Sequence, residues 1–251
     1  MSLPLTFKPS KNFKFIRLGN NNDGGYLLGN QTINDTKTLI SFGVLDDCSF
    51  ENDFKEKNQV KILCFDQINY KTFWIKKIYN DLGASIYNFN FPFLKKTLSK
   101  YFMFKTFFKD KSNFLFKKYI TKGSLNEILE DNKNIEKPLL LKIDIEGSEY
   151  RLLDEIISNQ NFLSGLIIEF HDVDLNLNKI NEFIENFSLS LSHIHPNNYG
   201  LTDNLGNPSV IEMTFEKNPV SESGKNILPN LLDQPCDPEK KDIELKFSIQ
   251  N

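Results

Sequence analysis

Short apolar runs alternate with amphipathic segments along most of the chain. Seven runs have the length and composition of buried strands, and they cover residues 38–42, 60–65, 84–87, 138–143, 165–170, 189–194 and 209–215. The segments between them repeat apolar residues at helical spacing, and they cover residues 50–57, 72–82, 125–130, 149–157 and 177–187. Strands that alternate with helices predict an α/β fold, in which helices cover both faces of a mostly parallel sheet. The last strand follows a short turn rich in Asn and Gly, so we expect it to run antiparallel to the strand before it.

The two ends of the chain lie outside this alternation, although the length predicts a single domain over residues 1–251. Residues 1–37 form an N-terminal extension in which two apolar runs flank a loop of Asn, Asp and Gly, a pattern that predicts a hairpin. Residues 218–251 form a C-terminal tail that begins as a Pro-, Ser- and Asn-rich loop. Within the tail, residues 242–249 alternate in polarity and are expected to form an edge strand.

An insertion over residues 91–120 is rich in Phe and Lys. It holds eight lysines and one acid, whereas the whole chain has a net charge of −3. Four interpretations stay open: a helical cap whose Phe side chains pack on the sheet, a contact with a membrane surface or a second subunit of a homodimer, a lid whose lysines hold a phosphorylated acceptor, and a site for single-stranded nucleic acid. The acidic remainder of the chain argues against nucleic acid as a partner.

Composition argues against a membrane-spanning protein, a secreted protein and a protein held together by disulfides or zinc. No apolar run approaches the roughly 20 residues that a transmembrane helix needs, and the N-terminal residues lack the apolar core of a signal peptide. The three cysteines, at positions 48, 64 and 236, are an odd number at unrelated spacings. A disulfide framework or a four-ligand zinc site is therefore not expected, and reduced thiols in the cytoplasm fit best.

Ligands of an open α/β sheet bind beyond the carboxyl ends of its strands. Gly43 follows the first strand of the sheet and permits a sharp turn, and Asp66 ends the second strand 23 residues later. An acid at that position can accept hydrogen bonds from ribose hydroxyls. Because Leu45 stands where a GxGxxG motif would have its second glycine, a pyrophosphate-containing dinucleotide fits less well than a nucleoside.

Three side chains with acid–base or metal-binding chemistry follow later strands. Asp144 follows the run at 138–143, His171 the run at 165–170, and His195 the run at 189–194. Imidazole together with carboxylate suits a divalent metal, and it also suits a general base with an orienting acid. We expect Asp144, His171 and His195 to form one site, with both roles open.

One motif near the middle of the chain is highly specific: Leu141-Lys-Ile-Asp-Ile-Glu-Gly-Ser-Glu149. Further motifs support it by their order and spacing: Arg17-Leu-Gly, Asp23-Gly-Gly-Tyr26, Ser41-Phe-Gly-Val, Ser49-Phe-Glu51, Cys64-Phe-Asp66, Gly123-Ser-Leu-Asn-Glu-Ile-Leu129, Ile167-Ile-Glu-Phe-His171, His193-Ile-His-Pro-Asn-Asn198, Ile211-Glu-Met-Thr-Phe215 and Leu232-Asp-Gln-Pro. With these motifs the chain resembles the FkbM-like branch of S-adenosylmethionine-dependent methyltransferases.

This resemblance implies a Rossmann-like seven-stranded methyltransferase sheet and methyl transfer to oxygen. The acceptor it implies is a sugar hydroxyl of a natural product or of a bacterial surface glycan, such as capsule or lipopolysaccharide. The lysines of residues 91–120 add the expectation of a negatively charged acceptor, a nucleotide-linked sugar or a phosphorylated glycan. The cofactor is S-adenosylmethionine, with a divalent metal ion as a possible second cofactor, and the implied cofactor-binding residues are Asp23, Gly24, Gly25, Ser41, Gly43 and Asp66. A nicotinamide-dependent oxidoreductase and a non-catalytic glycan-binding module with a methyltransferase-like shell are the alternatives.

Overall fold

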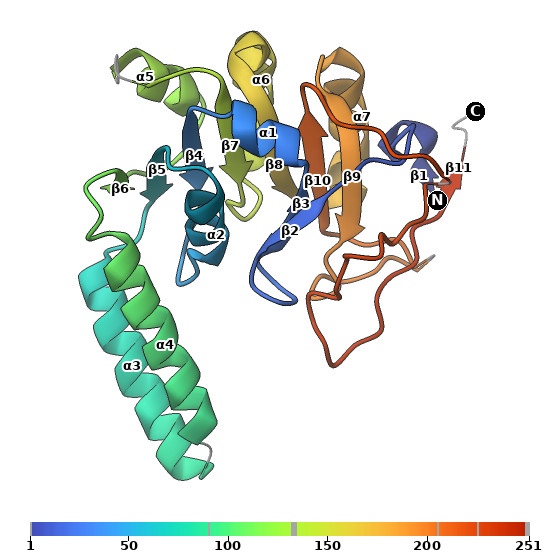
Figure 1. The fold of residues 1–251 in the computed structure, drawn as a ribbon. Helices are drawn as coiled ribbons and strands as arrows, with labels where there is room; N and C mark the ends of the chain where they lie inside the picture. Colours follow the sequence, from blue (N-terminus) through green and yellow to red (C-terminus); the bar gives the residue numbers. More distant parts are fainter. Residues whose placement is uncertain (1, 90, 132–134, 205, 225, 249–251) are drawn as a thin grey trace.

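A seven-stranded mixed sheet organises the protein (Figure 1). The computed structural model describes residues 2–89, 91–131, 135–204, 206–224 and 226–248. Across the sheet the strand order is β6-β5-β4-β7-β8-β10-β9, and β10 alone runs antiparallel to its neighbours. The strands are β4 (Thr38–Phe42), β5 (Lys61–Asp66), β6 (Asn113–Lys117), β7 (Leu139–Ile143), β8 (Leu163–Phe170), β9 (Ser190–Pro196) and β10 (Ile211–Glu216). The predicted methyltransferase-type sheet and its antiparallel last strand are confirmed.

Helices cover both faces of the sheet, as the alternation of elements predicted. Strand β4 sends Ile40 into one apolar core and Leu39 into the other, because successive side chains of a strand point to opposite faces. The first core is closed by α5 (Ser124–Asp131), α6 (Leu153–Asn159) and α7 (Val173–Asn186), and the second by α1 (Asn30–Asp35) and α2 (Ser49–Lys57). The described residues also contain three short 3-10 helices, η1 (Leu5–Phe7), η2 (Glu149–Arg151) and η3 (Gln160–Phe162).

The strand expected at residues 84–87 is wrong. These residues end α3 (Tyr70–Tyr87), which packs antiparallel against α4 (Phe91–Phe107) in a long hairpin that extends away from the sheet (Figure 1). A short apolar run does not distinguish a strand from a buried helix segment, and here the helical period of the preceding residues continues through it. The third strand in chain order is β6, so residues 91–120 comprise α4, a turn and an edge strand of the main sheet.

The ends of the chain pack on this framework. Strands β2 (Ile16–Gly19) and β3 (Gly25–Leu28) form the predicted antiparallel hairpin. In the tail, β11 (Phe247–Ser248) pairs with β1 (Leu3–Pro4) in a separate two-stranded sheet, so the predicted tail strand exists but does not extend the main sheet. No helix among the described residues is long and apolar enough to cross a membrane.

Candidate functional site

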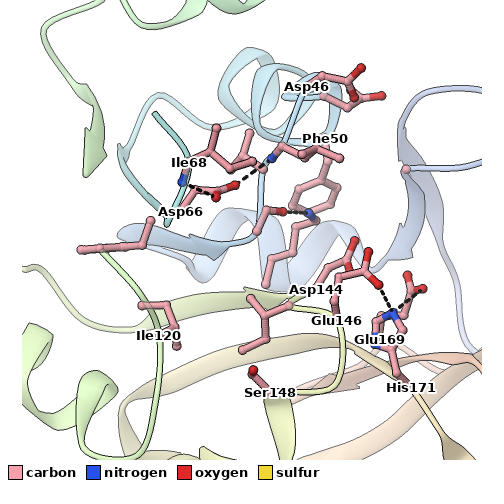
Figure 2. Close-up of a pocket in the computed structure, with 18 of the residues that line it drawn as sticks. Asp46, Phe50, Asp66, Ile68, Ile120, Asp144, Glu146, Ser148, Glu169 and His171 are labelled. Carbon is pink, nitrogen blue, oxygen red and sulfur yellow. Dashed lines mark hydrogen bonds and ion pairs between the residues drawn. The ribbon is translucent and has the colours of Figure 1, made fainter. Parts of the chain in front are cut away.

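A cleft of about 670 Å³ opens at the carboxyl ends of the parallel strands. Its walls come from the β2–β3 loop and from the segments that follow β4, β5, β6, β7, β8 and β9. Figure 2 shows Asp66 on one side of this cleft and Asp144, Glu169 and His171 on the other. The cleft therefore lies where an α/β sheet of this kind binds its ligands.

Gly43 forms the floor of the cleft between β4 and β7. Its φ of +80° lies in the left-handed region, and a Cβ built on it would be 1.7 Å from the backbone oxygen of Asp144. Only glycine fits such a close approach of two chain segments. The next residue but one, Leu45, also has a positive φ, of 45°, so the position where a GxGxxG motif would have its second glycine keeps a glycine-like conformation.

Asp66 ends β5, and its carboxylate already accepts three hydrogen bonds. Oδ2 accepts from the backbone N–H of Leu45 and from the Tyr70 hydroxyl, both at 3.0 Å. Oδ1 accepts from the backbone N–H of Ile68, also at 3.0 Å. A carboxylate offers about four acceptor positions, so one remains. A diol that binds here has to displace one donor, and the Tyr70 hydroxyl is the donor that is not part of the backbone.

The hairpin loop between β2 and β3 places Asp23 and Gly24 in the cleft wall. Burial, together with the charges of Glu212, Asp144 and Asp47, raises the pKa of Asp23 to about 6. A cation bound nearby would relieve this repulsion and favour the ionised carboxylate.

Two residues expected at the cofactor do not line the cleft. Ser41 is fully buried inside β4, and its hydroxyl donates to Glu51 Oε1 at 2.5 Å. Gly25 pairs with Gly19 in the hairpin ladder, where a Cβ would collide with the backbone oxygen of Asn20. Both residues therefore shape the chain beneath the cleft.

Asp144, Glu169 and His171 converge on the other side of the cleft. Each offers a ligand-type atom, and these atoms all lie within 4.8 Å of one another. Burial raises the pKa of the Asp144 carboxyl, and burial together with Asp144 and Glu212 raises that of Glu169 well above its usual value. Two carboxylates that repel each other in a partly desolvated site attract a proton or a metal cation.

Glu149 orients the His171 imidazole. Its Oε1 accepts from the backbone N–H of His171 at 2.8 Å and lies 3.3 Å from Nδ1. The other ring nitrogen, Nε2, is 3.5 Å from carboxylate oxygens of both Glu146 and Glu169 (Figure 2). Burial lowers the pKa of His171, but the hydrogen bond and charge of Glu149 and the charges of Asp144 and Glu146 outweigh it, so the pKa is raised.

His195 does not join this group. Its Nδ1 lies 3.4 Å from Glu212 Oε2 and its Nε2 lies 3.1 Å from Asp242 Oδ2, so both ring nitrogens face other carboxylates. The structure thus brings Asp144 and His171 together with Glu169, and it places His195 in a second group with Glu212 and Cys236. The separation is a tertiary effect, because the partners of His195 come from β10 and from the C-terminal tail.

The sequence contains a signal for Glu169. Glu169 and His171 are two residues apart at the end of a strand, so their side chains project to the same side. Glu169 also accepts a hydrogen bond from Asn197 Nδ2 at 3.0 Å, which ties the end of β8 to the loop after β9. Lys142, whose ammonium lies 5.3 Å from the centre of the Tyr26 ring, has no comparable signal in the sequence, because its position near Gly43 depends on strand register.

The comparison of the sequence with protein families adds a decisive match. A family profile described as the methyltransferase FkbM domain matches residues 7–192, which contain Gly43, Asp66, Asp144, Glu169 and His171. The chain belongs to the FkbM methyltransferase family. A search of curated protein sequences found no match.

A comparison with solved structures finds several that are similar to this FkbM-family protein. An rRNA methylase from Streptococcus thermophilus is 11% identical, with 75% of this chain and 93% of that chain covered and a TM-score of 0.40. A precorrin-6y C5,15-methyltransferase from Geobacter metallireducens is 14% identical, with 75% and 86% covered and a TM-score of 0.39. TrmK from M. capricolum, in complex with S-adenosylhomocysteine, is 12% identical, with 78% and 70% covered and a TM-score of 0.38. At such low similarity, the functional argument rests on the family match and on the site itself.

Proposed function

We propose that this protein transfers a methyl group from S-adenosylmethionine to a hydroxyl oxygen of a sugar-type acceptor. The observation that carries the proposal is that Asp144, Glu169 and His171 share one cleft with Gly43 and Asp66. One side of the cleft then has the features of a nucleoside site and the other has groups that accept a proton.

The cleft fits the cofactor in charge and in character. Seven acids and three lysines line it, so it attracts a ligand with a sulfonium and an ammonium group. Asp66 is the acceptor for ribose hydroxyls, and Ile68, Tyr119 and Ile120 provide an apolar surface for adenine. The bound cofactor would supply an electrophilic methyl group.

Methyl transfer to oxygen also requires that the acceptor hydroxyl lose its proton. A sugar hydroxyl is a very weak acid, so the protein has to accept this proton or stabilise the oxyanion. His171 presents Nε2 toward Glu169 while Glu149 holds Nδ1. Asp144 and Glu169 are the further acceptors, and the raised pKa values of their carboxyls bring them closer to that of a base that works near neutral pH.

The same three residues fit a divalent metal ion. Two carboxylate oxygens and one imidazole nitrogen within 4.8 Å are a donor set for a hard or borderline cation such as Mg²⁺ or Mn²⁺. An ion held there would lower the pKa of the acceptor hydroxyl. We favour the metal-assisted form over a histidine base alone because two carboxylates converge with the imidazole, and prolonged chelation distinguishes the two.

The charged side chains of the cleft limit which acceptors can bind there. Among the lysines of the expected lid, only Lys100 and Lys118 line the cleft; Lys100 pairs with Asp46 and Asp47, and Lys118 pairs with Glu127. The reacting part of the acceptor is therefore an uncharged sugar hydroxyl. A nucleotide-linked sugar would have to place its phosphates toward Lys100 or Lys118, whereas a surface glycan needs no such contact.

The experiment is an assay with purified full-length protein. Calorimetry with S-adenosylhomocysteine and, separately, with NAD tests the cofactor class, and a methyltransferase binds only the first. Mass spectrometry and NMR then locate the methyl group on products formed from nucleotide sugars and glycan oligosaccharides. Binding of NAD in place of S-adenosylhomocysteine would identify an oxidoreductase, and binding without turnover of any hydroxyl acceptor would favour the non-catalytic module.

A further inference from the structure

A second cluster of ligating side chains lies outside the residues that line the cleft. His195 on β9 and Glu212 on β10 are direct partners in the antiparallel ladder, and Cys236 and Asp242 approach them from the C-terminal tail. His195, Glu212 and Cys236 are 3%, 5% and 2% exposed, which separates this cluster from the acidic groups common on protein surfaces. Its donors are one nitrogen, one sulfur and carboxylate oxygens.

The spacing of the donors matches a tetrahedral metal site. Glu212 Oε2 is 3.4 Å from His195 Nδ1, Glu212 Oε1 is 3.7 Å from Cys236 Sγ, and one ligand atom from each residue lies within 4.8 Å of the others. Zinc bonds of about 2.0–2.1 Å to nitrogen or oxygen and about 2.3 Å to sulfur give tetrahedral edges of roughly 3.3 and 3.6 Å. Small movements of the side chains would therefore place all three donors around one ion.

Asp242 supplies the outer partner that a metal-bound histidine usually has. Its Oδ2 lies 3.1 Å from Nε2 of His195, on the side of the ring opposite the nitrogen that faces Glu212. Such a carboxylate fixes the ring orientation and makes the imidazole a stronger donor. The His195 imidazole therefore has the Asp242 carboxylate at one ring nitrogen. Its other ring nitrogen faces the oxygen and sulfur donors of Glu212 and Cys236.

The local charge favours a cation. The carboxylates of Glu212 and Asp242 lie 3.4 Å and 3.1 Å from the two ring nitrogens of His195, and Glu212 Oε1 also faces the Cys236 thiol. Two carboxylates around one imidazole and one thiol attract a divalent ion, which would replace the imidazolium proton and the thiol proton.

We propose that His195, Glu212 and Cys236 bind a zinc-class divalent ion, with Asp242 orienting the imidazole. Mixed nitrogen, oxygen and sulfur donors select zinc over Mg²⁺ or Ca²⁺. A water or the second oxygen of Glu212 completes four ligands. This site is distinct from the oxygen-rich group of Asp144, Glu169 and His171, which contains no sulfur.

The ion would have a structural role. It would link the tail to β9 and β10 beside two existing attachments, the pair of His193 and Asp233 at 2.9 Å and the hydrogen bonds of Asn198 to the backbone of Asp237. The loop after β9 also carries Asn197, which donates to Glu169 in the cleft. Fixing the tail therefore supports one wall of the candidate active site.

Cobalt titration of the metal-free full-length protein tests this proposal. Co²⁺ bound by a thiolate absorbs in the near ultraviolet, so the band reports Cys236 and not the sulfur-free group in the cleft. The wild-type protein should bind one cobalt with this band, and zinc should abolish the band and raise the unfolding temperature. Cys48→Ser is the matched control, since Cys48 is also buried but lies in the apolar core that α1 and α2 close, away from His195 and Glu212.

Cys236→Ser should lose the band and the zinc-dependent rise in unfolding temperature, whereas Cys48→Ser should keep both. Asp242→Asn should keep the band but weaken metal binding by about 10- to 100-fold. A folded wild-type protein that shows neither the band nor the thermal shift has only a protonated histidine between two carboxylates, which overturns the proposal. A band that persists in Cys236→Ser overturns it as well. Binding of S-adenosylhomocysteine, measured in parallel, confirms folding and tests the proposed function separately.

Discussion

The backbone oxygen of Asp144 lies 1.7 Å from the position that a Cβ on Gly43 would take. The first loop of the candidate cofactor site and the strand end that carries the candidate catalytic acid are therefore in direct contact. Because both contacting groups belong to the backbone, a shift of the loop after β4 would require a shift of the chain at the end of β7. The relative position of the two sides of the cleft therefore depends on this close approach between the ends of β4 and β7.

Gly43→Ala should destabilise the protein and abolish cofactor binding. The left-handed conformation alone costs a side chain about 1–2 kcal/mol, and the collision with Asp144 should bring the total loss of unfolding free energy above about 3 kcal/mol. Gly123→Ala is the control, because Gly123 has a φ of +89° but nothing within 4 Å of its Cβ position. Denaturant titration of the two variants checks the difference, and equal losses would show that the contact with Asp144 carries no cost.

Asp66→Ala should weaken S-adenosylhomocysteine binding by roughly 10- to 100-fold, through loss of about 1–3 kcal/mol of hydrogen bonding to ribose. Tyr70→Phe should not weaken it, since the Tyr70 hydroxyl occupies an acceptor position on Asp66 that the ribose needs. Calorimetry on both variants checks this pair of expectations. Unchanged affinity in Asp66→Ala contradicts a ribose contact at this residue.

Asp23 should make S-adenosylmethionine binding depend on pH. Its pKa is raised from 3.8 to about 6, so its contribution to folding stability is present below pH 3.8 and is lost as the pH rises through 6. A cationic cofactor has the opposite preference, because it binds better to the ionised carboxylate. Affinity should rise about tenfold between pH 5 and pH 7, and binding near pH 6 should release protons. Asp23→Asn should flatten this profile, and a wild-type affinity that is constant over the range argues against the contact.

Asp144→Asn and His171→Ala should each reduce kcat by about 10²- to 10⁴-fold and leave S-adenosylhomocysteine affinity close to wild type. The matched control is Asp154→Asn, because Asp154 is exposed on α6 and is not among the residues that line the cleft. Glu149→Gln, which loosens the imidazole, should shift the pH profile of kcat more than it changes KM. Full activity of the Asp144 or His171 variant would exclude that residue from the chemistry.

Lys100 should matter more for the cleft than the exposed lysines of the α3–α4 hairpin. Its ammonium is 3.2 Å from Asp46 and 3.5 Å from Asp47, and burial lowers its pKa less than these two acids raise it. Lys100→Met should therefore loosen the loop after β4 and raise KM for the cofactor. Lys105→Met, on the same helix but exposed, should change neither cofactor nor acceptor KM. Steady-state kinetics on both variants tests this expectation. A large rise in acceptor KM in Lys105→Met alone would instead support a lid whose lysines hold a phosphorylated acceptor.

The sequence determined six of the seven strands of the sheet, the hairpin and the strand ends that carry Gly43, Asp66, Asp144 and His171. These features depend on short-range patterns: apolar runs, turn residues and the rule that ligands bind at carboxyl ends of strands. The sequence also placed polar residues two apart at the end of β8, and that period predicts that Glu169 and His171 share a side.

Only the tertiary structure decided which of these residues meet. The apolar run at 84–87 suits a strand or the end of a helix, and the helix that continues through it packs against α4. His195 left the cleft group because Glu212, its ladder partner, and Cys236 and Asp242, some 40 residues along the chain, surround its ring. The spacing of the cysteines gave no sign of a metal site, since its donors come from two strands and a tail. The sequence specifies the chemistry of each side chain. A functional site also requires short distances between particular side chains, and long-range packing sets those distances.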